Sequence, residues 1–318
     1  MHKGLLVAAA LRAGMASAAL AEYPEKPVRI IVGYAAGGGT DLTARLVAEH
    51  LSRQLGQPVV IENRPGGGGV VGRQYVAASK PDGYTLLIDS SSFAGYPVFT
   101  ASPLVDVQRD FEPLSLLNTN EVVLVADANS PFRNLAELAQ YAKEHPGELN
   151  FASNGPGVTL LSLEAIKDRF DIDIVKVEYK SSSEAYVALL AGEVDLGIWN
   201  LSRIRNDVAA GKAIPVAVSG RIADDALKGI ENASEVYDPG LVIASYNALY
   251  GPAGLPDEVE SRLAEALQAI KAEPELQSQL AALDQEPVFS DAATLAERRD
   301  ADIANWSAIA QKAGIAKQ

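Results

Sequence analysis

Gly33–Asp41 reads GYAAGGGTD and resembles a loop that could bind an anion. It follows the spacing of a nucleotide-binding P-loop, but Gly39 occupies the lysine position and Thr40 the hydroxyl position. A triphosphate needs that lysine and a Mg²⁺ site, whereas free backbone N–H groups at a helix start can hold a single carboxylate. The loop therefore predicts a carboxylate site, and the plain structural alternative is a tight turn capped by Thr40 or Asp41.

A second loop of the same kind, ASNGPGVT at Ala152–Thr159, also lies between an apolar run and a helical pattern. Both loops combine glycines with small hydroxyl or amide residues. Two copies of one arrangement favour a ligand held between two lobes, each of which contributes one strand–loop–helix unit.

Gly67, Gly69 and Gly72 match the glycine spacing of a dinucleotide-binding turn, and Asp89 lies near the position of a ribose ligand. Pro65 separates these glycines from the preceding apolar run, and residues 1–21 are expected to be an export signal, as argued below. Dinucleotide binding is therefore the weaker interpretation.

Other chemistry has few candidate residues. The chain has no cysteine, which excludes a thiol nucleophile and a disulfide framework. Only His50 and His145 remain after export, and both are expected at the surface, so we predict no metal site, no cofactor and no enzymatic activity. An exported hydrolase that uses Ser91 or Ser92 with a carboxylate partner is the alternative from a different class.

The pattern of elements around these loops predicts an α/β protein. Apolar runs predict strands at Val28–Tyr34, Pro58–Asn63, Thr85–Ser90, Val122–Ala126, Leu149–Ser153, Asp173–Tyr179, Val194–Trp199, Ile214–Ser219 and Ile243–Tyr250. Helical spacing marks Asn134–His145, Ser182–Ala191, Pro256–Ala272 and Ala292–Lys312. This alternation favours largely parallel sheets followed by a helical tail.

Residues 1–21 read as a signal peptide, with Lys3, an apolar core and an A-x-A site that ends at Ala21. Cleavage there would leave 25 basic and 41 acidic residues, a formal charge of −16. Such a balance argues against nucleic acid, which is bound through Lys and Arg. We expect a periplasmic protein; a cytosolic nucleotide-binding protein that retains residues 1–21 is a further alternative.

The chain resembles the Bug-type periplasmic receptors of tripartite tricarboxylate transporters over nearly all of its mature length. The stretches that carry the resemblance are YPEKPVRIIVGYAAGGGTDLTAR at 23–45, LGQPVVIENRPGGGGVVG at 55–72, KPDGYTLL at 80–87, PGELNFAS at 146–153 and GPAGLP at 251–256. The resemblance also accounts for the glycines at 67–72 without a dinucleotide.

The resemblance implies a type II-like periplasmic-binding-protein fold with a cleft between two lobes, the first at 22–122 and 242–318 and the second at 123–241. It implies a monomeric receptor that closes on a small carboxylate, with dicarboxylates and aromatic carboxylates as candidates, and docks on a permease with a large and a small subunit. Carried over by position, the ligand-binding residues are Tyr34, Gly38, Gly39, Thr40, Asp41, Ser91, Ser92, Ser153, Asn154, Gly155, Gly157, Thr159, Trp199 and Asn200.

Three departures from the family pattern bear on the ligand. Val158 stands where a hydroxyl residue is common, Leu161 where a histidine is common, and Trp199 precedes Asn200 where many members have Asp-Asn. Each change makes the position more apolar. We therefore expect a ligand with an apolar or aromatic body that packs on Trp199, unless Trp199 belongs to the core of the second lobe.

Overall fold

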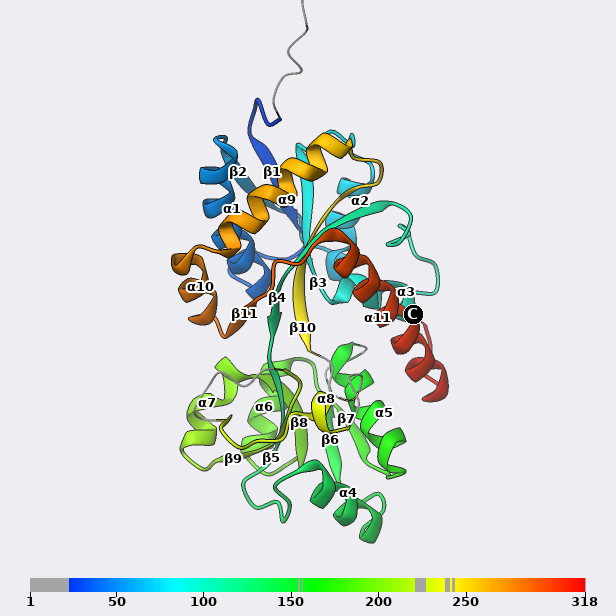
Figure 1. The fold of residues 1–318 in the computed structure, drawn as a ribbon. Coiled ribbons are helices and arrows are strands. Elements are labelled where there is room, and N and C mark those ends of the chain that lie inside the picture. The colour runs from blue at the N-terminus through cyan, green and yellow to red at the C-terminus, as the bar shows by residue number, and fades with distance from the viewer. Residues whose placement is uncertain are drawn as a thin grey trace, which may run out of the picture.

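The protein has two lobes, each built around its own β-sheet (Figure 1). The computed structural model describes residues 23–317, except 154, 156, 221–226, 238–240 and 242–243. The predicted signal peptide at residues 1–21 lies outside the described residues. The prediction of an α/β fold is confirmed.

The first lobe contains a six-stranded sheet with the strand order β11-β4-β10-β3-β1-β2. Its strands are β1 (Val28–Val32), β2 (Val59–Asn63), β3 (Thr85–Ser90), β4 (Phe111–Asn120), β10 (Ser245–Pro252) and β11 (Gln285–Pro287). Its helices are α1 (Gly39–Leu55), the 3-10 turn η1 (Gly67–Gly69), α2 (Val70–Ala77), α3 (Ser92–Phe99), α9 (Asp257–Lys271), α10 (Pro274–Ala281) and α11 (Ala292–Lys312).

Helices cover both faces of this sheet, which explains why β1 is apolar at consecutive positions. Ile30 and Val32 pack in a core with residues of α1, α9 and α10. Ile31 points to the opposite face and packs with residues of α2, α3 and α11. Successive side chains of a strand alternate between faces, so a strand buried on both sides loses the polar alternation.

The second lobe contains a five-stranded sheet with the order β7-β6-β8-β5-β9. Its strands are β5 (Val122–Asp127), β6 (Asn150–Ser153), β7 (Val175–Glu178), β8 (Leu196–Asn200) and β9 (Ala213–Val218). Its helices are α4 (Leu135–Glu144), α5 (Val158–Phe170), α6 (Ser182–Leu190), α7 (Leu201–Ala209) and α8 (Ala233–Val236). Helices α4, α5 and α8 contribute to the core on one face, and α6 and α7 to the core on the other.

The sheets are mixed, which corrects the prediction of largely parallel sheets. β1 is parallel to β2 and β3, but β10 runs antiparallel to both β3 and β4. Likewise β5 is antiparallel to β8 and β9 in the second lobe. The chain crosses to the second lobe from β4 to β5 and returns through β10, so β10 runs in the opposite direction to β4.

Two strands of the first lobe, β4 and β11, were not expected from the sequence. β4 reads FEPLSLLNTN, and its internal Pro113 argues against a central strand. Pro113 pairs with Tyr250 at a shift in the β4–β10 register, where the regular ladder is interrupted. The three residues of β11 are too few to give a periodic signal.

The lobes touch on both sides of the crossing strands. The last turns of α11 extend from the first lobe to α5 of the second, and Trp306 and Ala310 share a buried cluster with Leu161 (Figure 1). On the other side, Arg205 of α7 pairs with Asp284, which precedes β11. The two lobes are therefore held together by contacts other than the connecting strands.

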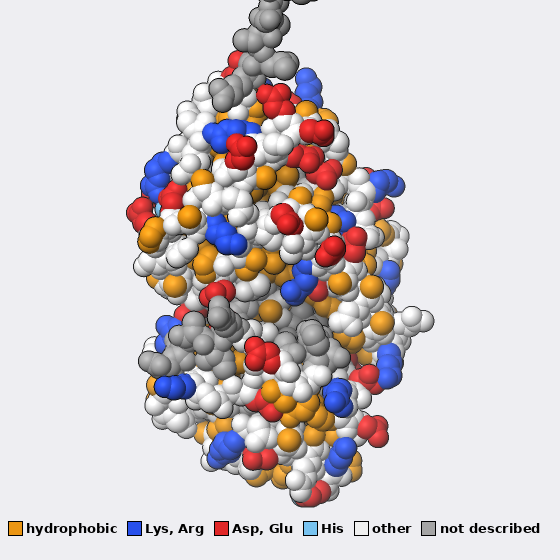
Figure 2. All heavy atoms as spheres, viewed as in Figure 1, with side chains coloured by type: hydrophobic (Ala, Val, Ile, Leu, Met, Phe, Trp, Pro, Cys, Tyr) orange, Lys and Arg blue, Asp and Glu red, His pale blue; other side chains and the backbone are white. Residues whose placement is uncertain are grey.

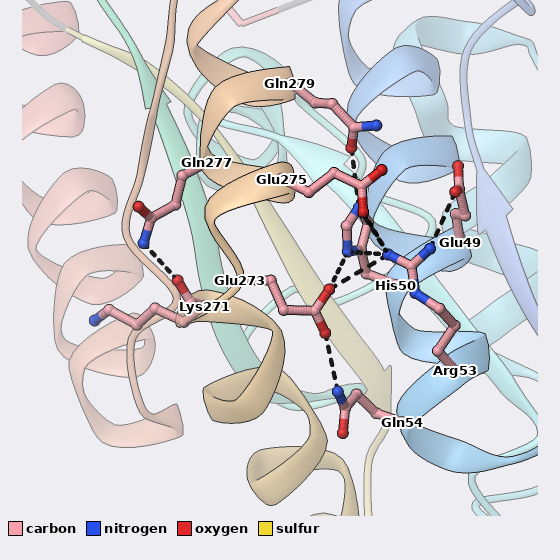
Figure 3. A network of polar contacts seen from close by, with 9 residues as sticks. All are labelled: Glu49, His50, Arg53, Gln54, Lys271, Glu273, Glu275, Gln277 and Gln279. Carbon is pink, nitrogen blue, oxygen red and sulfur yellow. Dashed lines mark hydrogen bonds and ion pairs between the residues drawn. The ribbon is translucent and has the colours of Figure 1, made fainter.

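His50 is fully buried between α1 and α10, so the prediction that it lies at the surface is wrong. Figure 3 shows its ring between the two helices. Nδ1 lies 2.5 Å from a carboxylate oxygen of Glu273, and Nε2 lies 2.9 Å from the side-chain oxygen of Gln279. Arg53 adds an ion pair to Glu273. These contacts make His50 part of the packing between helices of the first lobe.

Acidic and basic side chains are interspersed over both lobes on the face shown in Figure 2, where no continuous basic patch is visible among the described residues.

Within the described ranges, no helix combines the length and apolar character needed to cross a bilayer. The same residues contain no group of three or more His, Asp or Glu side chains placed to hold a metal ion.

Candidate functional site

Each of the two glycine loops connects a strand to the uncapped start of a helix. The first joins β1 to α1, whose N-cap is Gly38, and the second joins β6 to α5, whose N-cap is Gly157. Glycine has no side chain that could accept a hydrogen bond from the first turn. The first N–H groups of α1 and α5 are therefore not satisfied by a capping side chain.

Asp41 holds the first loop together from inside. Its carboxylate is 1% exposed and accepts hydrogen bonds from the backbone N–H of Gly37 (2.8 Å), from Arg45 and from Asn63. Burial raises the pKa of Asp41, but the hydrogen bonds from Arg45, Gly37 and Asn63 outweigh it and bring that pKa below its usual value. The charge of Asp41 is thus balanced by neighbouring donors.

A cavity of about 760 Å³ lies between the lobes. The first lobe supplies residues of η1, α2 and α3, and the second supplies the loop and first turn of α5. Its walls are formed by Gly67, Gly68, Val70, Arg73, Ser90, Ser91, Ser92, Gly95, Tyr96, Phe99, Thr100, Ser102, Leu104, Gly155, Gly157, Val158, Thr159 and Ser245. The cavity therefore combines hydroxyl groups with an apolar and aromatic wall.

A second cavity of about 380 Å³ adjoins the first, because both are lined by Val158, Thr159 and Ser245. Its remaining lining residues are Val122, Ser162, Ser182, Ser183, Ile198, Trp199, Asn200, Ser202 and Arg203. The start of α5 is thus the point at which the two cavities meet.

The predicted site residues divide into three groups. The two cavities bring together Ser91, Ser92, Gly155, Gly157, Thr159, Trp199 and Asn200. The lining of neither cavity includes Tyr34, Gly38, Gly39, Thr40, Asp41 or Ser153, and Asn154 lies outside the described residues. Gly37, Gly38 and Gly39 are exposed, whereas Ser153 is fully buried.

Sequence reasoning missed a buried ion pair in the wall of the larger cavity. Arg73 and Asp89 are 1% and 0% exposed; Arg73 Nε donates to Asp89 Oδ2 at 2.7 Å and Nη2 donates to Oδ1 at 3.1 Å. Burial alone would lower the pKa of Arg73, but the charge of Asp89 raises it above its ordinary value. Its signal in the sequence was a lone arginine beside the glycine cluster and an aspartate at the end of an apolar strand.

Tyr34 belongs to this buried cluster. Its hydroxyl donates to Asp89 Oδ1 at 2.7 Å and contacts the hydroxyls of Ser90 and Ser92. Burial raises the pKa of Tyr34 well above its ordinary value, and the negative charge of Asp89 adds to the rise. The side chain is therefore neutral at physiological pH and connects the first loop to the cavity wall through Ser92.

Trp199 packs mainly into the second lobe. It is 6% exposed, its Nε1 donates to the carbonyl of Ser182 at 3.2 Å, and its ring meets Tyr186 edge-on. It also belongs to the lining of the smaller cavity. Of the other two departures from the family pattern, Val158 lines both cavities, whereas Leu161 is buried against Trp306.

These contacts do not favour the two alternatives, dinucleotide binding through Asp89 and hydrolysis by Ser91 or Ser92. Asp89 is fully buried and both of its oxygens bind Arg73, which does not favour a contact with a ribose hydroxyl. Ser92 accepts a hydrogen bond from Arg73, which does not favour a nucleophile. His50 and His145 pair with Glu273 and Glu148 rather than with Ser91 or Ser92.

Comparison with known proteins gives consistent matches over most of the chain. Residues 43–315 match the family model described as the tripartite tricarboxylate transporter family receptor. A UPF0065 protein of Bordetella pertussis is 34% identical over 273 residues, which cover 83% of this chain and 82% of that protein.

Solved structures of periplasmic binding proteins are similar to this chain over most of its length. The periplasmic binding protein BugD is 29% identical, with a TM-score of 0.71, over 93% of this chain and 100% of that one. Rpa4515 of R. palustris, whose structure was solved with adipate, is 29% identical, with a TM-score of 0.74, over the same shares of the two chains.

Proposed function

Because the chain belongs to the tripartite tricarboxylate transporter receptor family, we propose that it binds a small carboxylate between its lobes and delivers it to a membrane permease. The observation that carries this proposal is the cavity of about 760 Å³ to which both lobes contribute. The similar protein Rpa4515 has been solved with a dicarboxylate, adipate, which supports the ligand class.

The ligand carboxylate meets the start of α5, where Gly155, Gly157 and Thr159 line the cavity. Free N–H groups at a helix start suit one carboxylate, and Gly157 leaves room for it to approach the backbone. Closure of the lobes then brings Gly38–Asp41 of the first loop to the ligand from the other side. A ligand that contacts both loops only in the closed state shifts the population toward closure.

We place this receptor in the periplasm as a monomer, after cleavage of residues 1–21. The lobes are assigned to residues 22–122 with 242–318 and to residues 123–241. The closed receptor docks on the large and small permease subunits, and the bound acid leaves chemically unchanged. N-terminal sequencing of the protein from its host is expected to begin at Glu22.

Mass spectrometry of small molecules released from the purified protein, followed by calorimetric titration with the acid identified, tests the function. The expected result is a stoichiometric carboxylate that rebinds and is recovered unchanged after incubation. Conversion of the acid would favour the hydrolase alternative, and absence of binding to any carboxylate would refute a carboxylate receptor.

A further inference from the structure

The first-lobe wall of the larger cavity contains Arg73, which is paired with Asp89 behind it. Arg73 is the one charged residue in that lining among the residues that the structure describes. Arg73 belongs to α2, directly after Gly72, and Asp89 lies near the end of β3. The pair therefore decides what charge this wall offers to a ligand.

The positive charge of Arg73 is already used within the protein. Nε and Nη2 are bound to the two oxygens of Asp89, and Nη2 also donates to Ser92 at 3.0 Å. Both side chains are buried, so separating them would leave two desolvated charges without a partner. The charge of Arg73 is therefore already offset by Asp89 before a ligand binds, and only the N–H groups of Nη1 remain without a partner in these contacts.

The rest of this wall suits an uncharged group. Tyr96, Phe99 and Leu104 line it with aromatic and aliphatic surface, and Ser90 and Ser92 add hydroxyl groups. The hydroxyl proton of Tyr34 is donated to Asp89 and does not reach the ligand. A second carboxylate buried here would lose its hydration and would meet an arginine whose charge Asp89 already offsets. The formal charge of the whole chain, −14, adds further repulsion for a dianion.

We infer that this receptor selects monocarboxylates with an apolar or aromatic body and rejects dicarboxylates, because Asp89 neutralises Arg73 in the cavity wall. The inference rests on the proposed function, since it assumes that the cavity is the carboxylate site. The inferred ligand therefore differs in class from adipate, the dicarboxylate with which the similar protein Rpa4515 was solved.

The test is a calorimetric titration of the full protein at pH 7 with two matched pairs of acids, hexanoate against adipate and benzoate against terephthalate. Each pair differs by one carboxylate on the same carbon framework. We expect the monocarboxylate of at least one pair to bind about tenfold or more tightly than its partner. Equal or tighter binding of adipate and terephthalate would overturn the inference but leave the carboxylate receptor intact, whereas failure of all four acids would count against both.

Two variants test the cause. Asp89→Asn releases the charge of Arg73, and Thr100→Lys adds an unpaired cation to the cavity wall without touching the buried pair. Both are expected to raise the affinity for adipate relative to hexanoate by about tenfold. Asp302→Asn is the control, because it removes a partly buried partner of Arg298 that does not line the cavity. An unchanged preference in Thr100→Lys would overturn the inference even if Asp89→Asn failed to fold.

Discussion

At the scale of single residues, Gly39 tests the proposal that the first loop approaches the ligand carboxylate when the lobes close. It begins α1 in an exposed loop, and a Cβ atom placed there would meet no other heavy atom within 4 Å. The position is therefore free for a ligand to approach and equally free to accept a larger residue without strain in the protein itself.

Gly39→Val is expected to abolish binding of the receptor's acid, because its side chain occupies the approach to the first helix turn. The melting temperature should stay close to that of the wild type, since surface substitutions usually change stability by less than about 0.5 kcal/mol. Calorimetric titration and thermal melting measure the two effects. Ala293→Val in the exposed first turn of α11 is the control and should alter neither. Unchanged affinity in Gly39→Val would place the site away from the first loop.

Asp41→Asn is expected to destabilise the protein at pH 7 by about 1–3 kcal/mol, because a buried carboxylate with charged hydrogen-bond partners is replaced. The pKa of Asp41 is lower in the folded protein than its usual value, so its stabilising contribution is complete above the unfolded-state pKa of about 3.9 and is lost as the pH falls through the folded-state pKa. Denaturant unfolding measures the free energy of unfolding of Asp41→Asn and of wild type. The difference between the two should shrink as the pH is lowered from 7 to 3.

The control for this variant is Asp257→Asn, at an exposed position in the first turn of α9. Its effect is expected to stay below about 1 kcal/mol, because only the interaction with the helix dipole is changed. A difference between Asp41→Asn and wild type that is independent of pH would mean that the charge of Asp41 is not the stabilising feature.

At the scale of elements, the glycine cluster that contains Gly67, Gly69 and Gly72 has a packing function. A Cβ atom at Gly72 would lie 2.9 Å from the Cα atom of Gly33, and one at Gly33 would lie 2.8 Å from the Cα atom of Gly69. The end of β1 and the start of α2 therefore approach so closely that neither can carry a side chain. The same approach positions η1 and Arg73 at the cavity wall.

Gly72→Ala is expected to cost about 1–3 kcal/mol in unfolding free energy, because the methyl group meets backbone atoms that cannot rotate away. Chemical denaturation monitored by circular dichroism measures this loss. Gly39→Ala is the matched control, since its methyl group meets no atom and alanine is favoured in a helix. Equal midpoints for the two variants would show that β1 and α2 can move apart at little cost.

At the scale of the whole molecule, the contact between α11 and α5 links the ligand site to the arrangement of the lobes. Leu161 is fully buried against Trp306 and Ala310, although it belongs to the helix whose first turn lines the cavity. Any movement of the second lobe on ligand binding must therefore slide or release this contact.

Leu161→Ala is expected to lower stability by about 2–5 kcal/mol, as for other buried leucines, and to loosen the contact between the lobes. Small-angle X-ray scattering of the ligand-free protein should then give a larger radius of gyration than wild type. Leu163→Ala is the control, because Leu163 is equally buried but lies in the core of the second lobe alone. The same radius for both variants would show that this contact does not set the lobe arrangement.

The sequence by itself determined the α/β class, most of the strands and the two strand–glycine loop–helix units, because these depend on local periodicity and on glycine positions. It could not determine that Asp89 of β3 pairs with Arg73 of α2, that Leu161 packs on Trp306, or that the chain crosses between sheets through β4 with its internal Pro113. Each of these depends on how different elements pack against one another, so only the tertiary structure decided them. The charge that the cavity offers to a ligand is the most consequential of them, because an arginine of α2 that would attract a second carboxylate when unpaired is neutralised by an aspartate of β3.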